Sequence, residues 1–323
     1  MANWLHDAQY SLVVFTLFIQ ATVGAFWVLL VSDFLKRRAP DKVQDAFTRI
    51  GTYILIPMTV IGLIFSTTHL GRPMYAWRAL KHFETSWMSR EIWATGAFFG
   101  LIALYTYLWY KRMEDGELRR LIGVVTGLVG AFAVLTQAMI YTIPGRPMWN
   151  HWSTLVLFVA SVLILGPLAV ATAYSFAWGR VIDLKDGEET VRRSHRRLGL
   201  TLLAGAVTYG VGLAARVGYL AAGAAAAGSA PGARGAAAVG AETVKTALWI
   251  GQGIMDQYGW LLNLQVLLGI GLPAVLAVAL WWLHKRGASL KLCNGLIAAG
   301  LVLVLVGELA GRALFYLTGK PWF

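Results

Sequence analysis

A histidine and a glutamate lie close to the ends of two apolar stretches and could together accept protons. His69 follows the apolar stretch 50–67 in the sequence THLGRP, and Glu91 directly precedes the next stretch, 92–110. An imidazole at a lipid–water boundary can take a proton from a lipid-soluble molecule and pass it to water. We therefore treat His69 and Glu91 as candidate catalytic residues of a reaction that releases protons at a membrane surface. A histidine hydrogen-bonded to backbone or water, with no catalytic role, is the alternative.

Three cations lie between these two residues. Arg72, Arg78 and Lys81 follow His69 in the same connection. Arg72 and Arg78 could stabilise an anion that develops on a bound substrate, and Arg72 and Lys81 could also dock a partner protein. A base, a carboxylate and cations can thus meet at one depth of the membrane.

Ionisable residues inside apolar spans are costly and therefore suggest function. Arg216, Glu308 and Arg312 lie in this position, and Glu308 and Arg312 are four residues apart, so they could pair on one helix. All three are expected in the membrane half that contains His69, and no buried charge is expected in the other half. This one-sided arrangement suits a quinol, so Glu308 and Arg312 join the candidate quinol-binding residues. A structural clamp between helices is the alternative.

The composition indicates an integral membrane protein. Hydrophobic residues make up 58% of the 323 residues, charged residues 14%, and mean hydropathy is +0.61. The single cysteine, Cys293, rules out an all-cysteine iron–sulfur site in this protein, so any cluster must be in a partner. We expect no metal site. The net charge of +12 is better explained by membrane topology and partner docking than by nucleic-acid binding.

Apolar runs long enough to cross a bilayer predict an all-α integral membrane protein with eight transmembrane helices. The expected spans are 11–32, 50–67, 92–110, 121–141, 153–176, 198–220, 260–283 and 292–317. Short connections leave no soluble domain, so residues 1–323 form one polytopic unit. The first span lacks a basic n-region and a cleavage pattern and is expected to be a retained helix.

The distribution of positive charge predicts the orientation. Lys and Arg concentrate in the odd-numbered connections, such as 36–49 and 180–197, which places those connections on the cytoplasmic side of the cell membrane. Both termini and the His69 connection should then face outward, to the periplasm. One outer connection, 221–240, is rich in Ala and Gly and is expected to be a loop or weakly helical.

A short motif of Gly, a cation, Pro and an aromatic residue follows the second, fourth and eighth spans. Each copy could simply end a membrane helix. Alternatively, the three copies form one basic, aromatic surface on which a peripheral subunit docks. The candidate docking residues are Arg72, Lys81, Arg146, Trp149, Lys320 and Trp322.

Three segments resemble the dimethyl sulfoxide reductase membrane anchor subunit family. They are HLGRPMYAWRAL from His69, SWMSREI from Ser86 and GELAGRALFY from Gly307. The eight-span layout with outward termini also matches that family, so the resemblance covers nearly the whole sequence. It implies that His69 and Glu91 are associated with menaquinol. Arg72 and Arg90 and the Ala/Gly-rich loop depart from the family pattern, which leaves the terminal substrate open.

The resemblance implies a non-catalytic-core subunit of an oxidoreductase complex that carries the quinol oxidation site. It would oxidise menaquinol and pass electrons to a four-cluster iron–sulfur subunit and a molybdopterin catalytic subunit, with protons released on the outer side. Haem, iron–sulfur clusters and molybdopterin are not expected in this protein itself. An equivalent anchor for polysulfide, tetrathionate or formate chemistry is the alternative, and a secondary transporter is a more distant one. A haem-carrying cytochrome b is disfavoured, because His69 and His82 are separated by Arg72, Pro73 and Arg78 and no second histidine pair exists.

Overall fold

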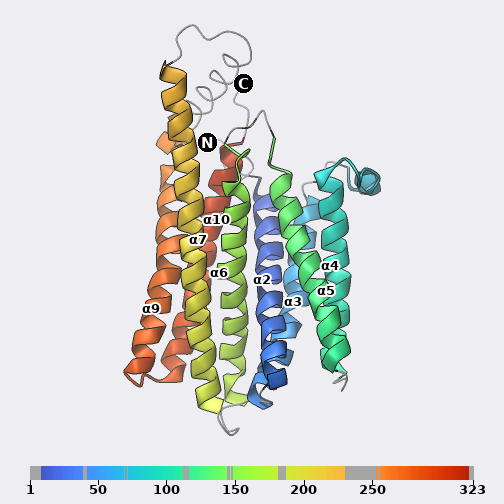
Figure 1. The fold of residues 1–323 in the computed structure, drawn as a ribbon, viewed down its shortest axis with the longest axis vertical. Coiled ribbons are helices and arrows are strands. Elements are labelled where there is room, and N and C mark those ends of the chain that lie inside the picture. The colour runs from blue at the N-terminus through green and yellow to red at the C-terminus, as the bar shows by residue number, and fades with distance from the viewer. Residues whose placement is uncertain are drawn as a thin grey trace.

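The computed structural model is a bundle of long helices that run along one common axis (Figure 1). It describes residues 9–38, 42–68, 70, 72–111, 116–143, 146, 148–180, 187–229, 252–253 and 255–319. The described residues include eight helices that are long and apolar enough to cross a membrane, and no strands. The prediction of an all-α protein with eight spans is confirmed.

Long helices suit a lipid environment, where every backbone N–H and C=O must be paired within the segment. The long helices are α2 (Tyr10–Arg38), α3 (Lys42–Thr68), α4 (Trp87–Tyr110), α5 (Gly116–Met139), α6 (Ser153–Ala177), α7 (Gly187–Ser229), α9 (Leu272–Lys285) and α10 (Leu290–Leu317). Three short segments complete them: the 3₁₀ helices η1 (Pro73–Leu80) and η2 (Trp178–Arg180), and the π-helix η3 (Gln265–Gly271). The π-helix lies within the seventh span, Met255–Lys285.

Several helices are longer than their apolar stretches. α4 begins at Trp87, so Glu91 lies inside the helix rather than before it. α7 continues to Ser229, so the first part of the expected 221–240 loop is helical; the rest of that loop lies outside the described residues. α5 ends at Met139, two residues before the predicted end of its span at 141.

The two ends of the bundle consist of different helix termini. The upper end, at the top of Figure 1, contains the start of α2, η1, the start of α4 and the end of α10. The lower end contains the end of α2, the start of α5, the start of α7 and the start of α10.

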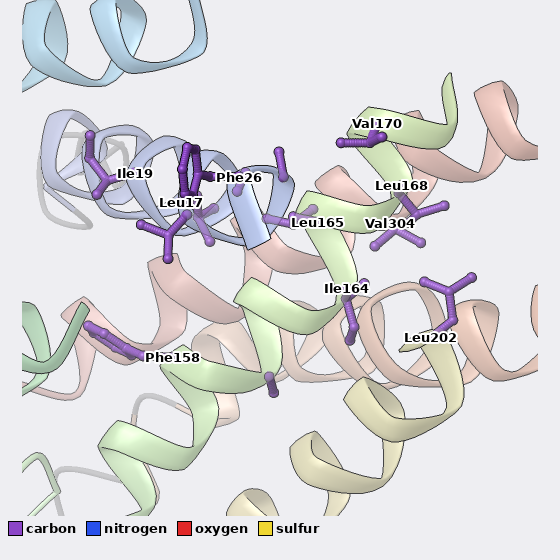
Figure 2. Close-up of a cluster of buried hydrophobic side chains, with 14 of the residues drawn as sticks. Leu17, Ile19, Phe26, Phe158, Ile164, Leu165, Leu168, Val170, Leu202 and Val304 are labelled. Atoms are coloured by element: carbon purple, nitrogen blue, oxygen red, sulfur yellow. The ribbon is translucent and has the colours of Figure 1, made fainter. Parts of the chain in front are cut away.

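Helices α2 and α6 form the centre of the bundle. Figure 2 shows buried apolar side chains on α2, α6, α7 and α10, with Leu168, Leu202 and Val304 close together where α6, α7 and α10 meet. α2 and α6 approach so closely at Gly24 and Gly166 that a Cβ on either glycine would collide with the other helix's backbone. Small residues commonly allow such contact between membrane helices.

Candidate functional site

The loop that follows His69 is held against the start of α4. Ser86 caps α4 by accepting a hydrogen bond from the Ser89 backbone N–H at 3.4 Å. The Ser89 hydroxyl donates to the carbonyl of Ala79, and the Trp93 indole donates to the carbonyl of Leu80 at 3.2 Å. The SWMSREI motif therefore fixes η1 on α4 at the upper end.

The three predicted cations of this loop are exposed. Arg72, Arg78 and Lys81 face outward on and beside η1. The Arg78 guanidinium lies 4.4 Å from the centre of the Tyr75 ring, and the Lys81 ammonium lies 4.4 Å from that of Trp77. We call this exposed group of cations and aromatic rings the η1 surface. Its chemistry suits an interfacial or partner-facing role.

Glu91 lies in a different environment from these cations. Its side chain is 8% exposed and lies near Gln137 on α5, whose side-chain nitrogen makes no hydrogen bond of good geometry within the described residues. His69 lies outside the described residues and directly follows the last residue of α3, Thr68. The structure thus separates a buried carboxylate from an exposed cationic surface at the same end.

A series of hydrogen bonds leads from Gln137 to Glu308 through the centre of the bundle. Gln20 on α2 donates to the Gln137 side-chain oxygen at 3.2 Å and accepts from the Arg312 guanidinium at 2.7 Å. Arg312 also donates to the Ser161 hydroxyl at 3.3 Å, and Ser161 donates to the Glu308 carboxylate at 2.7 Å. We call these residues together with Glu91 the upper polar network. It joins Glu91, Glu308 and Arg312, three residues that the sequence marks at separate positions.

The expected direct pair between Glu308 and Arg312 is wrong. Among the described residues neither side chain forms an ion pair; they meet instead through Ser161. Their helical spacing allows pairing, but both side chains reach toward α6 and α2. The alternative of an interhelical clamp is confirmed for Arg312, which ties α10 to α2 and α6.

The upper polar network has unused hydrogen-bonding capacity. One carboxylate oxygen of Glu308 and the side-chain nitrogen of Gln137 are buried and make no hydrogen bond of good geometry within the described part of the protein. Burying a polar group without a partner costs about 1–3 kcal/mol. Such atoms are available to a ligand or to water.

Two tyrosines lie beside this network. The hydroxyls of Tyr141 and Tyr316 are 2.6 Å apart, and both side chains are buried. Burial, together with the neighbouring Tyr316 and Glu91, raises the pKa of Tyr141, so its hydroxyl keeps its proton. The pair therefore supplies a neutral hydroxyl donor close to the network.

Trp149 belongs to the packing around Tyr141 rather than to the expected docking surface. Its side chain is 8% exposed, its indole donates to the Phe315 carbonyl at 2.7 Å, and a Cβ on Gly319 would collide with its ring. Arg146 lies 5.6 Å from the centre of its ring. Trp149 is therefore removed from the predicted docking surface. Lys320 and Trp322 lie outside the described residues, so the rest of that surface stays a prediction.

A cavity of about 400 Å³ opens at the upper end between α6, α7, α10 and the seventh span. Arg216 lines it and clamps α7 to the start of α6 by donating to the hydroxyls of Ser153 at 3.2 Å and Thr154 at 2.7 Å. Gln265, at the start of the π-helix, also lines it and donates to the Tyr209 hydroxyl at 2.9 Å. The clamp that was one alternative for Arg216 is confirmed.

The lower end also contains buried charge, which corrects the expectation that the opposite half has none. Asp33 is fully buried and accepts two hydrogen bonds from Arg119, at 2.7 and 2.9 Å. The Tyr105 hydroxyl lies 3.1 Å from the same carboxylate. Asp33 was missed because it lies just past the apolar stretch 11–32, whereas α2 itself continues to Arg38.

The lower end also brings two histidines together, which corrects the expectation that no second histidine pair exists. His195 on α7 and His284 on α9 face each other with ring nitrogens 3.2 Å apart, and Cys293 lies nearby on α10. Arg192 contacts the other ring nitrogen of His284 at 3.0 Å. Because a guanidinium can only donate, this His284 nitrogen accepts, and the other one donates to His195. The neutral histidines therefore satisfy each other without a metal ion.

Sequence reasoning missed several residues of the upper end. Tyr141, Tyr209 and Ser161 contribute hydroxyls, but nothing in their local sequence distinguishes them from other span residues. The π-helix that carries Gln265 has one sequence signal, the cluster of Gly269, Gly271 and Pro273 near its end. π-Helices are often found at functional sites.

The helices and the buried polar residues define a multi-pass membrane protein with polar groups inside its bundle. The model of the DMSO reductase anchor subunit (DmsC) family matches residues 1–183, more than half of the sequence. The protein belongs to this family of membrane anchor subunits.

Individual relatives agree with this assignment. The protein is 30% identical over 165 residues to a chain of the anaerobic dimethyl sulfoxide reductase of Haemophilus influenzae, covering 51% of its own length and 58% of the relative. It is 26% identical over 317 residues to a chain of the anaerobic dimethyl sulfoxide reductase of Escherichia coli, covering 95% and 94%. It is 27% identical over 185 residues to a sulfite dehydrogenase subunit of Allochromatium vinosum, covering 53% and 56%. Two of these three matches thus span a little over half of the relative's length.

A solved structure shares the fold. The bd oxidase structure from Geobacillus thermodenitrificans matches with a TM-score of 0.68 at 14% identity, covering 99% of this protein and 87% of the matched oxidase polypeptide. At this identity the similarity concerns the arrangement of helices alone.

Proposed function

We propose that this protein is the membrane anchor and quinol-oxidising subunit of a DMSO reductase-like complex in the cell membrane. Menaquinol would give up two protons and two electrons at the upper end. The electrons would leave to a four-cluster iron–sulfur subunit and then to a molybdopterin catalytic subunit. The family assignment and the names of the relatives support the complex, and the upper polar network supports the site.

The observation that carries this proposal is the buried Glu91 carboxylate at the start of α4, beside the Gln137 side chain with its unused donor capacity. A quinol needs an acceptor for its hydroxyl proton and a donor for its oxygen, and these two groups offer both. His69, one residue after α3, would take the proton from the other hydroxyl. Arg72 and Arg78 on the η1 surface would add positive potential near the developing anion.

The proposed orientation rests on the distribution of positive charge. Lysine and arginine side chains concentrate at the lower end, for example in Arg119, Arg120, Arg192 and Arg193. By the positive-inside rule, the lower end would face the cytoplasm and the upper end the outside. Protons and electrons would leave on the same side, so the subunit would move no net charge across the membrane. The η1 surface would be one face on which the iron–sulfur subunit docks.

The test uses the intact complex in native membranes and measures menaquinol oxidation. Glu91→Gln and His69→Arg should each reduce the rate at least about 100-fold, the usual contribution of a general base, while complex assembly stays normal. Glu84→Gln and His82→Arg make the same changes at exposed positions of the neighbouring turn and should leave the rate unchanged. Loss of assembly in the Glu91 and His69 variants, rather than loss of rate, would assign these residues to structure.

The direction of electron flow has a second candidate. One relative is a sulfite dehydrogenase subunit, and a dehydrogenase removes electrons from its substrate. In that case the same site would reduce a quinone and take up two protons. Measuring both menaquinol oxidation and menaquinone reduction by the purified complex, with sulfite and dimethyl sulfoxide as alternative partner substrates, distinguishes the two. Polysulfide, tetrathionate and formate chemistry stay further alternatives for the catalytic subunit.

A further inference from the structure

The cavity is lined by α6, α7, α10 and the seventh span. In Figure 1 these helices lie on the opposite side of α2 from η1 and α4. The cavity measures about 400 Å³, and most of its lining is apolar, including Phe158, Leu213 and Phe315. Its polar lining residues come from several helices and are Tyr209, Arg216, Gln252, Asp256, Gln265, Arg312 and Thr318. An apolar cavity with a few converging polar groups is the usual form of a small-molecule site.

The environment of Arg312 favours a ligand in this cavity. The residue is 5% exposed, and one of its terminal nitrogens is used by Gln20 and Ser161. Its remaining N–H groups make no hydrogen bond, and no carboxylate pairs with it, within the described part of the protein. Its guanidinium carbon lies 3.8 Å from the centre of the Phe158 ring. A buried cation in this state calls for an oxygen acceptor supplied from the cavity.

Further donors line the cavity. The Tyr209 hydroxyl accepts a hydrogen bond from Gln265, which leaves its own proton available to a ligand. Arg216 uses two of its nitrogens on Ser153 and Thr154 and lies 5.4 Å from the Phe315 ring. Donors and aromatic rings thus surround the same space.

The rim shows how a ligand would enter. Val217 and Met255 line the cavity and are 59% and 38% exposed on the outside of the bundle, where lipid would lie. The exposed carboxylate of Asp256 lies among the same lining residues. This carboxylate disfavours a lipid phosphate and can accept a hydrogen bond from a hydroxyl.

We propose that this cavity is a second quinone-binding site, which holds the ring of an isoprenoid quinone while its tail lies along the Val217 rim. Ring oxygens would accept from Arg312 and Tyr209, and a quinol hydroxyl would donate to Asp256. The site is separate from Glu91, although Gln20 and Gln137 connect Arg312 to that side of the bundle. Only the choice of quinone as the ligand rests on the proposed function.

The experiment measures menaquinone-4 bound to the purified complex, in the Glu91→Gln background so that the proposed catalytic site is impaired. Leu213→Trp fills the cavity and should weaken binding at least about tenfold, because a filled cavity excludes the quinone ring. Leu203→Trp places the same ring at an exposed position of α7 that does not line the cavity and should have no effect. Tyr209→Phe, which removes one hydrogen bond, should weaken binding about fivefold.

Two results would overturn this site. Menaquinone-4 binding that is equal in Leu213→Trp, Leu203→Trp and the parent would show that no quinone occupies the cavity. Loss of co-purifying phospholipid in Leu213→Trp, with quinone binding unchanged, would make the cavity a lipid site. If binding depends on Leu213 but the wild-type complex oxidises no menaquinol, the proposed function fails and this inference stands.

Discussion

The two ends of the bundle hold buried charge in opposite ways. At the lower end, Asp33 receives two hydrogen bonds from Arg119 and lies beside the Tyr105 hydroxyl, so charge is matched by charge. At the upper end, Glu308 and Arg312 are joined only through neutral side chains such as Ser161. The Asp33 carboxylate is fully paired, whereas Glu308 keeps one carboxylate oxygen without a partner within the described residues, although uncharged Asn294 at the lower end also lacks partners there. We infer that the first stabilises the fold and the second is available to bind.

The largest expected effect concerns the lower pair. Arg119→Leu removes both hydrogen bonds and the nearer cation of the fully buried Asp33 carboxylate, leaving Arg120 at 4.0 Å, and should reduce the free energy of unfolding by up to about 3–5 kcal/mol. Thermal unfolding of the detergent-solubilised protein measures this. The double variant Asp33→Asn/Arg119→Leu removes both charges and should regain much of the loss. Equal stability of the single and double variants would show that the pair itself carries no such energy.

A smaller effect is expected for the upper polar network. Gln20→Leu removes the acceptor of Arg312 and the donor to Gln137, and should cost about 1–3 kcal/mol of stability. Because Gln20 lies between Glu91 and Arg312, the variant should also slow menaquinol oxidation, measured per assembled complex. Gln9, outside the network, offers a Gln→Leu control. A slow rate without any loss of stability would separate the catalytic role from the structural one.

A still smaller effect is expected at His151, beside the upper cavity. Its ring nitrogen lies 2.9 Å from the Ser153 hydroxyl that also receives Arg216. Partial burial, followed by the charge of Arg216, lowers the pKa of His151 from its usual 6.5. The unfolded protein therefore binds this proton more readily, so this contribution to stability is present above pH 6.5 and is lost as the pH falls below it.

His151→Asn tests this pH dependence. The melting temperature of the wild type should fall slightly more than that of the variant between about pH 7.5 and about pH 5.5 in matched detergent buffers, because only the wild type takes up this proton on unfolding. Parallel curves for the two proteins would show that the proton on His151 does not matter to folding.

No effect is expected from metal removal at the lower end. Arg192 donates to one nitrogen of His284, which directs the other N–H toward His195 and adds positive charge where a cation would bind. Chelator treatment and added zinc should both leave the melting temperature unchanged. Zinc-dependent stabilisation that disappears in Cys293→Ser would instead make His195, His284 and Cys293 a metal site.

The sequence predicts the elements of this molecule better than the contacts between them. Hydropathy marks all eight spans, and the cost of burying charge marks Glu308 and Arg312. It does not mark Asp33, because hydropathy averages end the span at 32 and its partner Arg119 is 86 residues away. The prediction of a direct Glu308–Arg312 pair is wrong for a related reason. Helical spacing identifies neighbours on one helix only, whereas the observed hydrogen-bond partners of these side chains lie on α6 and α2. Trp149 is of a residue type that is common at membrane interfaces, but Phe315 and Gly319 enclose its side chain.

The contact between Gly24 and Gly166 limits how far α2 and α6 can move relative to each other. Transporters with inverted repeats work by rocking one group of helices against another around a central site. Here the backbones of α2 and α6 are in direct contact at Gly24 and Gly166. No side chain lies between them at this contact that could change its rotamer and let the two helices slide or rock. A rigid contact at the centre keeps a bound quinol at a constant distance from the electron acceptor in a docked partner subunit. Such a bundle suits electron transfer better than the transport of a solute.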